Sequence, residues 1–234
     1  MKKVFRILFT LFVAIIYSSC SKEELQSYNC SCLTLNKGMK VSILGDSYST
    51  FQNFLYPASS PTYYPNKKAE VTDVTQTWWS LFITKNQLRL EHNNSYSGST
   101  ITRKNNTQSS YVERYTELGN PDIIFVFGGT NDSWQRIPLG NFQYNNWNDD
   151  NLQNFRPAFA YLLYQIQQTY LNTKIINIIN TDLKKEYKES MEIICQHYNI
   201  CNISLGDFEK KDGHPSKKGM ESIYQQITKA LIIK

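Results

Sequence analysis

The sequence has 234 residues, with 25 Lys and Arg against 20 Asp and Glu, which gives a formal net charge of +5. Three of the basic residues fall within the first 19 positions, so the other 215 residues carry 22 basic and 20 acidic side chains and a net charge of only +2. So small a charge excludes the strongly basic surface of most nucleic-acid-binding proteins, and we predict no nucleic-acid partner. The remaining length suits a single α/β domain.

The first residues have the layout of a secretory signal peptide. Three basic residues precede an apolar run over residues 7–17, and small residues come directly before Cys20. The apolar run is too short to span a bilayer comfortably. An N-terminal anchor helix that is never cut is the alternative, and we predict instead that residues 1–19 are removed on export.

The residues up to Cys20 resemble a bacterial lipobox, in which the cysteine is lipidated and becomes the new N-terminus. The Ser-Lys-Glu-Glu sequence at 21–24 resembles the short signals that send some lipoproteins to the outer face of the outer membrane. These resemblances imply a membrane contact through a lipid anchor at Cys20, and an outer-membrane lipoprotein for which the cell surface is one location. We predict a polar tether over 20–37, followed by one domain over 38–234.

Strand and helix patterns alternate along this domain. Short apolar runs predict strands at residues 40–44, 88–92, 122–127, 174–179 and 202–205, and helical spacing predicts helices at residues 76–84, 152–171, 183–198 and, after a cap at Ser216, up to 233. The aromatic, Pro- and Ser-rich residues 51–65 are predicted to form a loop or a broken helix. The alternation predicts a three-layer α/β/α sandwich with a central parallel sheet of about five strands.

Four short motifs each lie just after a predicted strand. They are Gly45-Asp46-Ser47 after the first strand, Gly98 after the second, Gly129-Thr130-Asn131-Asp132 after the third, and Asp212-Gly213-His214 before the last helix. Because the carboxyl ends of parallel strands lie along one edge of a sheet, we expect these motifs to converge there. Ordinary turn chemistry explains each motif alone, but it does not explain their assembly at one edge.

The residue types in these motifs suit nucleophilic acyl transfer. Ser47 becomes a nucleophile only when a base takes its proton, and His214 can do so near neutral pH. The backbone N–H groups of Ser47 and Gly98 and the side-chain amide of Asn131 could stabilise the oxyanion that forms in acyl transfer. Asp46 and Asp132 are predicted to anchor their loops by hydrogen bonds rather than to act as acids.

Together, in this order and spacing, the four motifs resemble the blocks of the SGNH, or GDSL-type, hydrolase family over residues 40–230. The resemblance implies a flavodoxin-like fold and a serine esterase that works without a metal or cofactor. We expect it to hydrolyse acyl esters, such as acetyl esters, on small molecules or glycans. A lipid or thioester hydrolase, and a catalytically silent surface module that binds glycans, are the alternatives.

One departure from the family pattern concerns the third catalytic residue. The family usually has an aspartate three residues before the histidine, where this chain has Lys211, whereas Asp212 lies two residues before His214. We assign Asp212 as the catalytic acid. The other possibilities are that Glu209 or Asp207 takes its place, or that a Ser47–His214 dyad operates alone.

The cysteines and the loop aromatics allow more than one interpretation. If Cys20 is lipidated, four cysteines remain, at 30, 32, 195 and 201, and they form one or two disulfides or buried thiols rather than a zinc site. His92 and His197 do not form part of a metal-ligand sequence pattern, so we do not assign them to a metal site. Trp134 and its neighbours follow Asn131 and would wall the site, where flat rings would suit sugars. Alternatively these rings, and those of the loop that contains Tyr63, only pack their loops down.

Overall fold

A computed structural model describes residue 30 and residues 33–103 and 109–233 of the chain. Its strands are β1 (Thr34–Leu35), β2 (Lys40–Gly45), β3 (Arg89–Ser95), β4 (Ile123–Phe127), β5 (Lys174–Ile179), β6 (Cys201–Ser204), β7 (Lys210–Lys211), β8 (His214–Pro215) and β9 (Ile232–Ile233). Its α-helices are α1 (Trp78–Lys85), α2 (Tyr111–Arg114), α3 (Thr130–Trp134), α4 (Phe155–Thr169), α5 (Lys185–His197) and α6 (Lys217–Ala230). Short 3-10 turns are η2 (Ser47–Ser49), η3 (Val74–Gln76) and η4 (Asn151–Gln153).

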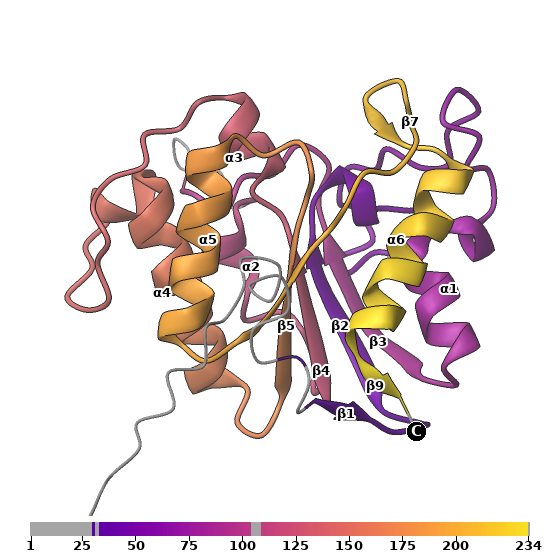
Figure 1. The fold of residues 1–234 in the computed structure, drawn as a ribbon, viewed down its shortest axis with the longest axis horizontal. Helices are drawn as coiled ribbons and strands as arrows, with labels where there is room; N and C mark the ends of the chain where they lie inside the picture. Colours follow the sequence, from indigo (N-terminus) through magenta and orange to yellow (C-terminus); the bar gives the residue numbers. More distant parts are fainter. Residues whose placement is uncertain (1–29, 31–32, 104–108, 234) are drawn as a thin grey trace, which may run out of the picture.

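The central sheet has five parallel strands in the order β3-β2-β4-β5-β6. This is the strand order of flavodoxin-like folds, in which the chain reverses direction across the sheet beside its first strand. Helices α1 and α6 cover one face of the sheet, and α4 and α5 cover the other (Figure 1). The predicted three-layer sandwich with a parallel sheet of this size is confirmed.

Burial on both faces explains why the central strands are apolar throughout. In β4, Ile123, Phe125 and Phe127 enter the core beneath α1 and α6, while Ile124 and Val126 enter the core beneath α4 and α5. All five side chains are at most 1% exposed. Burying one such side chain contributes about 1.5–3 kcal/mol, so this strand alone is a large part of what fixes the sheet.

The ends of the domain differ from the sequence-based expectation. Strand β1 pairs in parallel with β9, and Leu35 is fully buried, so the last residues of the predicted tether are part of the fold. Helix α6 ends at Ala230, three residues before the predicted end, because the chain becomes extended to make that pairing. Its predicted cap is confirmed, since the Ser216 hydroxyl accepts a hydrogen bond from the Gly219 N–H. The signal segment and Cys20 lie outside the described residues.

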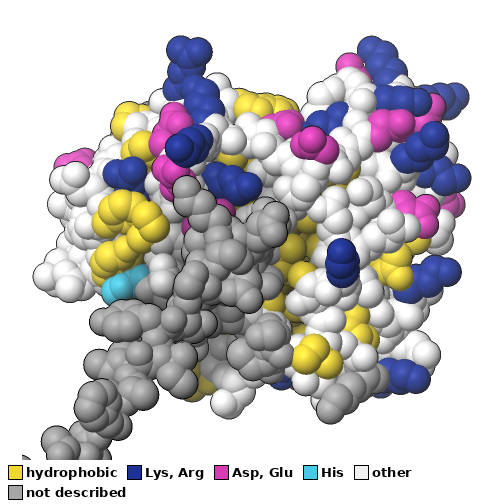
Figure 2. Space-filling view, in the orientation of Figure 1, with side chains coloured by type: hydrophobic (Ala, Val, Ile, Leu, Met, Phe, Trp, Pro, Cys, Tyr) yellow, Lys and Arg dark blue, Asp and Glu magenta, His cyan; other side chains and the backbone are white. Residues whose placement is uncertain are grey.

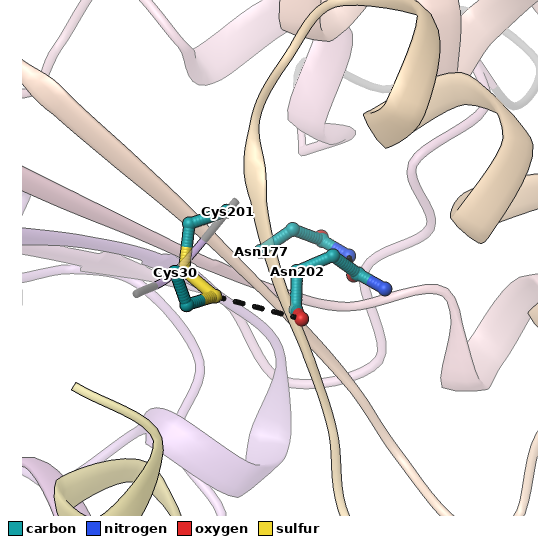
Figure 3. The surroundings of a disulfide bond; sticks show 4 residues. All are labelled: Cys30, Asn177, Cys201 and Asn202. Carbon is teal, nitrogen blue, oxygen red and sulfur yellow. Dashed lines mark hydrogen bonds between the residues drawn. A yellow bond between two sulfur atoms is a disulfide. The ribbon is translucent and has the colours of Figure 1, made fainter. Parts of the chain in front are cut away.

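A disulfide joins Cys30, before β1, to Cys201, the first residue of β6 (Figure 3). The two Cα atoms are 4.6 Å apart, and the Cys30 sulfur lies 3.7 Å from the Asn202 carbonyl oxygen. Cys195 is a free, buried thiol. The interpretation with at least one disulfide is therefore confirmed, and Cys32 lies outside the described residues.

Positive and negative side chains are intermixed over the face seen in Figure 2, as the small net charge of the domain leads one to expect. Among the helices of the described parts, none combines the length and the apolar character needed to cross a bilayer.

Candidate active site

The Gly45-Asp46-Ser47 motif begins at the end of β2, the strand that lies between β3 and β4 in the sheet. Gly45, the last residue of β2, pairs with Ser95 of β3 on one side and with Phe127 of β4 on the other. The three following loops therefore leave the same edge side by side. A Cβ atom at position 45 would lie 2.5 Å from the Ser95 hydroxyl oxygen and 2.7 Å from the Ser49 Cβ, so the close packing of this strand end favours glycine two residues before Ser47.

Ser47 and His214, which are 167 residues apart in sequence, are in direct contact. The Ser47 Oγ lies 2.9 Å from the His214 Nε2. Ser47 is the first residue of η2, and the Asp46 carboxylate caps this turn by accepting a hydrogen bond from the Tyr48 N–H at 3.0 Å. Since Ser47 is only 6% exposed, its hydroxyl is held in one place rather than displayed freely to solvent.

The β7–β8 hairpin places His214. Lys211 pairs with His214, and the two residues between them, Asp212 and Gly213, have φ angles of 54° and 73°. This left-handed pair is typical of a two-residue hairpin turn, for which Asp-Gly is a favoured sequence. The turn, rather than a longer loop, therefore sets the distance between Asp212 and the imidazole.

The contact between Asp212 and His214 is not the one expected from the sequence. The His214 Nδ1 lies 3.0 Å from the backbone carbonyl oxygen of Asp212, so this nitrogen has a backbone partner. The Asp212 carboxylate instead accepts a hydrogen bond from the Tyr63 hydroxyl at 3.0 Å. The expectation that the carboxylate itself binds Nδ1 is corrected here, because the left-handed turn presents the carbonyl to the ring.

The other two acids considered for this role are also placed away from the imidazole. Glu209 accepts a hydrogen bond from the Ser216 hydroxyl at the start of α6. Among the described residues, neither Glu209 nor Asp207 makes a hydrogen bond to His214. The geometry is therefore that of a Ser–His pair oriented by a main-chain oxygen.

The environment of His214 favours its neutral form. Burial lowers the pKa of the imidazole below its ordinary value, and the Asp212 carbonyl and carboxylate only partly oppose this. A neutral imidazole with a proton on Nδ1 leaves Nε2 free to accept the Ser47 proton. The site can thus supply a base at neutral pH.

The predicted oxyanion donors belong to Ser47 itself, to the loop after β3 and to the start of α3. Gly98 has a φ of +81°, a conformation that favours glycine, and its position is open, with no atom within 4 Å of an added Cβ. The N–H groups of Ser47 and Gly98 donate to none of the described residues. The Asn131 amide donates one hydrogen to the Ser99 carbonyl at 2.8 Å, which fixes the amide beside the Gly98 loop and leaves its second hydrogen for a ligand.

The prediction that Asp46 and Asp132 anchor loops is confirmed by their contacts. Asp132 accepts hydrogen bonds from the N–H groups of Ile101 and Thr102, at 2.8 and 3.1 Å, and from the Thr102 hydroxyl. Burial raises the pKa of both carboxyl groups, and that of Asp46 reaches about 7. Both are thus structural parts of the site.

Arg114, at the end of α2, is a site residue that the sequence analysis missed. It is 4% exposed, and burial lowers its pKa to about 10, so that it is still charged at neutral pH. It donates hydrogen bonds to the carbonyl oxygens of Gly45, Asn94 and Ser109, to the Asn94 side-chain oxygen and to the Ser99 hydroxyl. It therefore ties the ends of β2 and β3 to the Gly98 loop, and a lone arginine in the sequence carries no signal of that role.

The loop aromatics have different positions. Tyr63 stacks on His214, with ring centroids 3.5 Å apart. Trp134, three residues after Asn131 on α3, is 47% exposed. Tyr144 packs its loop down by stacking on His197 at 3.7 Å. Across the described part of the chain, no group of three or more His, Cys, Asp or Glu side chains is placed to hold a metal ion.

Comparison with known proteins agrees with this fold and arrangement. The model of the GDSL-like lipase/acylhydrolase family matches residues 39–231. A crystal structure from Bacteroides ovatus, described as that of a GDSL-like lipase, has 47% sequence identity and a TM-score of 0.80, and the match covers 82% of this chain and 97% of that one. A second, from Bacteroides uniformis, described in the same way, has 48% identity and a TM-score of 0.79 over 82% and 95% of the two chains.

More distant structures share the fold. An acetyl xylan esterase from Butyrivibrio proteoclasticus has 15% identity and a TM-score of 0.56, with 82% of this chain and 63% of that chain covered. No functionally curated protein matches the sequence.

A doubly wound parallel sheet with a serine–histidine pair at its carboxyl edge defines a hydrolase of the SGNH type. The chain belongs to the GDSL-like lipase/acylhydrolase family, because the family model spans most of it. It is therefore an acyl ester hydrolase by class, and the prediction of this family from the four motifs is confirmed.

Proposed function

We propose that the protein is a serine esterase that removes short acyl groups, such as acetyl, from carbohydrates by a Ser47–His214 mechanism. The observation that carries the mechanism is the 2.9 Å contact between Ser47 Oγ and His214 Nε2. It lies within the distance at which a base can take a proton from a nucleophile.

In the acylation step, Ser47 Oγ attacks the ester carbonyl carbon while its proton passes to His214 Nε2. The carbonyl oxygen becomes an oxyanion, which accepts hydrogen bonds from the N–H groups of Ser47 and Gly98 and from the Asn131 amide. The C–O bond to the alcohol then breaks, and His214 returns the proton to the leaving oxygen. An acyl-Ser47 ester and a free alcohol result.

In the deacylation step, His214 takes a proton from water, and the resulting hydroxyl attacks the acyl-Ser47 carbonyl. The second tetrahedral intermediate uses the same donors. When it collapses, the proton on Nε2 returns to Ser47 Oγ, and the carboxylic acid leaves. The Asp212 carbonyl keeps the Nδ1 proton in place during both steps, so that only Nε2 exchanges protons.

A polar cavity next to the loop that carries Gly98 supports a carbohydrate rather than a lipid as the alcohol part of the substrate. It has a volume of about 640 Å³, within the range of small-molecule sites. Its lining includes Ser59, Ser60, Glu113 and Glu117, together with Tyr96, two residues before Gly98, and the buried Arg114. The Ser59 and Ser60 hydroxyls can hydrogen-bond to sugar hydroxyls, whereas the alkyl part of a lipid alcohol offers them no partner. Glu113 and Glu117 already accept hydrogen bonds from Arg103 and Asn94, and the second oxygen of each carboxylate can accept from a sugar.

Fold neighbours are compatible with this substrate class. They include the acetyl xylan esterase above and a family two carbohydrate esterase from Clostridium thermocellum, whose structure was determined with cellohexaose. At 13–15% identity these likenesses establish the fold alone, so the cavity remains the stronger support.

The test compares acyl chain length and alcohol type on one preparation. We expect turnover of 4-nitrophenyl acetate to exceed that of the octanoate ester, and acetate to be released from acetylated xylo-oligosaccharides. Ser47→Ala should abolish both activities, and a fluorophosphonate probe should label Ser47. A preference for the octanoate ester would favour a lipid substrate, and full activity of Ser47→Ala would remove this serine from the mechanism.

We further propose that the protein is exported and anchored in the outer membrane through a lipid on Cys20. The Cys30–Cys201 disulfide supports export, because such bonds persist in oxidising compartments and are rare in the bacterial cytosol. Cys20→Ser should then move the protein from membrane to soluble fractions and abolish labelling with a fatty-acid analogue. A mutant that still sediments with membranes and still takes up the label would contradict the proposal.

A further inference from the structure

All three histidines of the chain are stacked on a tyrosine. His92 lies 4.1 Å from Tyr56, at an interplanar angle of 15°, and His197 lies 3.7 Å from Tyr144, also at 15°. The His214–Tyr63 pair is the closest and the most nearly parallel, at 3.5 Å and 9°. Stacking alone is thus common in this molecule and does not single out the pair at the site.

Tyr63 differs from the other two tyrosines in what its hydroxyl group binds. It donates to the Asp212 carboxylate at 3.0 Å, and it lies 3.3 Å from the Asp212 carbonyl oxygen, the atom that accepts from His214 Nδ1. Burial and the bond to Asp212 raise the pKa of Tyr63 to about 12, so the hydroxyl stays protonated and remains a donor. Tyr63 therefore contacts both the imidazole ring and the peptide that orients it.

The main chain of Tyr63 is in turn fixed to the nucleophile turn. Its N–H donates to the Thr50 hydroxyl at 2.9 Å, and that hydroxyl donates to the Ser47 carbonyl oxygen at 3.0 Å. The Thr50 side chain thus links the backbone of Tyr63 to that of Ser47. Movement of the imidazole relative to Ser47 would have to break this chain of contacts or slide past the ring.

Two further tyrosines hold the hairpin but not the imidazole nitrogens. The Tyr48 hydroxyl donates to the Gly213 carbonyl at 3.0 Å, and the Tyr64 hydroxyl donates to the Pro215 carbonyl at 2.7 Å. Both rings meet the imidazole edge-on rather than in a stack. They hold the hairpin backbone, whereas the stack with Tyr63 fixes the plane of the His214 ring.

We propose that Tyr63 is the positioning residue of His214 and takes the part that the aspartate plays in a Ser-His-Asp triad. Its ring fixes the imidazole plane, and its hydroxyl holds the Asp212 peptide so that the carbonyl keeps the proton on Nδ1. The face of the phenol also stabilises the imidazolium formed during acylation. The inference rests on the proposed function, since it assigns the role through the histidine of that mechanism.

The test uses Tyr63→Leu, which removes ring and hydroxyl, Tyr63→Phe, which removes only the hydroxyl, and Tyr56→Leu as the matched control on a second stacked histidine. For Tyr63→Leu we expect kcat on 4-nitrophenyl acetate to fall about 10- to 100-fold with KM within about threefold, the effect of a misplaced catalytic group. Tyr63→Phe should retain activity to within about fivefold, because a single lost hydrogen bond costs little free energy. Tyr56→Leu should retain activity to within about twofold, because His92 has no role in the proposed reaction.

A second measurement does not depend on turnover. Nitrogen-15 NMR of the imidazole reports which ring nitrogen carries the proton. In the wild-type protein we expect His214 to carry it on Nδ1, and in Tyr63→Leu we expect a mixture of the two tautomers, with no change in Tyr56→Leu. Tyr63→Met serves in the same way if the leucine variant does not fold.

The outcomes separate this inference from the proposed function. Wild-type kcat and an unchanged tautomer in Tyr63→Leu would overturn the role of Tyr63 while leaving the esterase mechanism intact. A wild-type protein without esterase activity would overturn the proposed function, and the tautomer measurement would then decide whether Tyr63 controls the His214 proton. An equal loss in Tyr56→Leu would show a general packing effect and would also refute the inference.

Discussion

Asp212→Asn tests directly whether a carboxylate or a main-chain oxygen orients the His214 imidazole of the proposed mechanism. The substitution is conservative in structure, because position 212 has a φ of 54° and asparagine adopts this conformation more readily than most residues. Asn-Gly is also a favoured sequence for this two-residue turn, so we expect the hairpin to persist. The change removes the charge and keeps the carbonyl oxygen that contacts His214 Nδ1.

The expected loss is small and follows from what the carboxylate contacts. In a Ser-His-Asp triad, the corresponding change costs about four orders of magnitude in kcat, or about 5 kcal/mol of transition-state stabilisation. Among the described residues the carboxylate accepts a hydrogen bond only from the Tyr63 hydroxyl, and one hydrogen bond contributes about 0.5–1.5 kcal/mol. We therefore expect kcat/KM to fall by less than about tenfold.

The pH profile of Asp212→Asn provides a second expectation, because the structure predicts the direction in which the pKa of His214 should move. The negative charge of Asp212 raises the pKa of His214, so its removal should move the acid limb of kcat/KM to lower pH. The assay is hydrolysis of 4-nitrophenyl acetate between pH 4 and 9, with His214→Ala as the inactive reference. A loss near 10⁴-fold in Asp212→Asn would refute the reasoning and show that the carboxylate orients the ring during turnover. A large loss in Glu209→Gln or Asp207→Asn instead would identify another acid.

Three further predictions concern the oxyanion site, a buried acid and the disulfide. Asn131→Ala should lower kcat by about two to three orders of magnitude in steady-state assays, and a change confined to KM would make Asn131 a binding residue. Because burial raises the pKa of Asp46 from 3.8 to about 7, its protonated form stabilises the fold below about pH 4, and this contribution is lost as the pH rises toward 7. Asp46→Asn should therefore flatten the fall in unfolding free energy between pH 4 and 8, by up to about 4 kcal/mol, and an unchanged pH dependence in urea denaturation would contradict the burial of an ionisable acid at this position. Cys201→Ser should lower the unfolding free energy by about 2–5 kcal/mol, because the disulfide closes a loop with a sequence separation of 171, and a variant with wild-type stability would refute this.

The fold class and the main members of the candidate site follow from patterns in the amino-acid sequence. Apolar runs such as residues 123–127 are typical of strands covered on both faces, and their alternation with amphipathic segments indicates a parallel sheet. The motif positions then follow, because every parallel strand ends at the same edge. That Ser47 and His214 meet could therefore be predicted without coordinates.

Contacts that would change if a side chain moved by one or two ångströms could be identified only in the folded structure. The sequence placed Asp212 near His214, but only the left-handed turn determines that the carbonyl, and not the carboxylate, contacts Nδ1. The bonds of Arg114 to two strands and a loop, the stack of Tyr63 on His214 and the pairing of β1 with β9 likewise join residues that are distant in sequence. Local patterns fix the direction and burial of an element, whereas the partner of a side chain across the fold depends on how all the elements pack together.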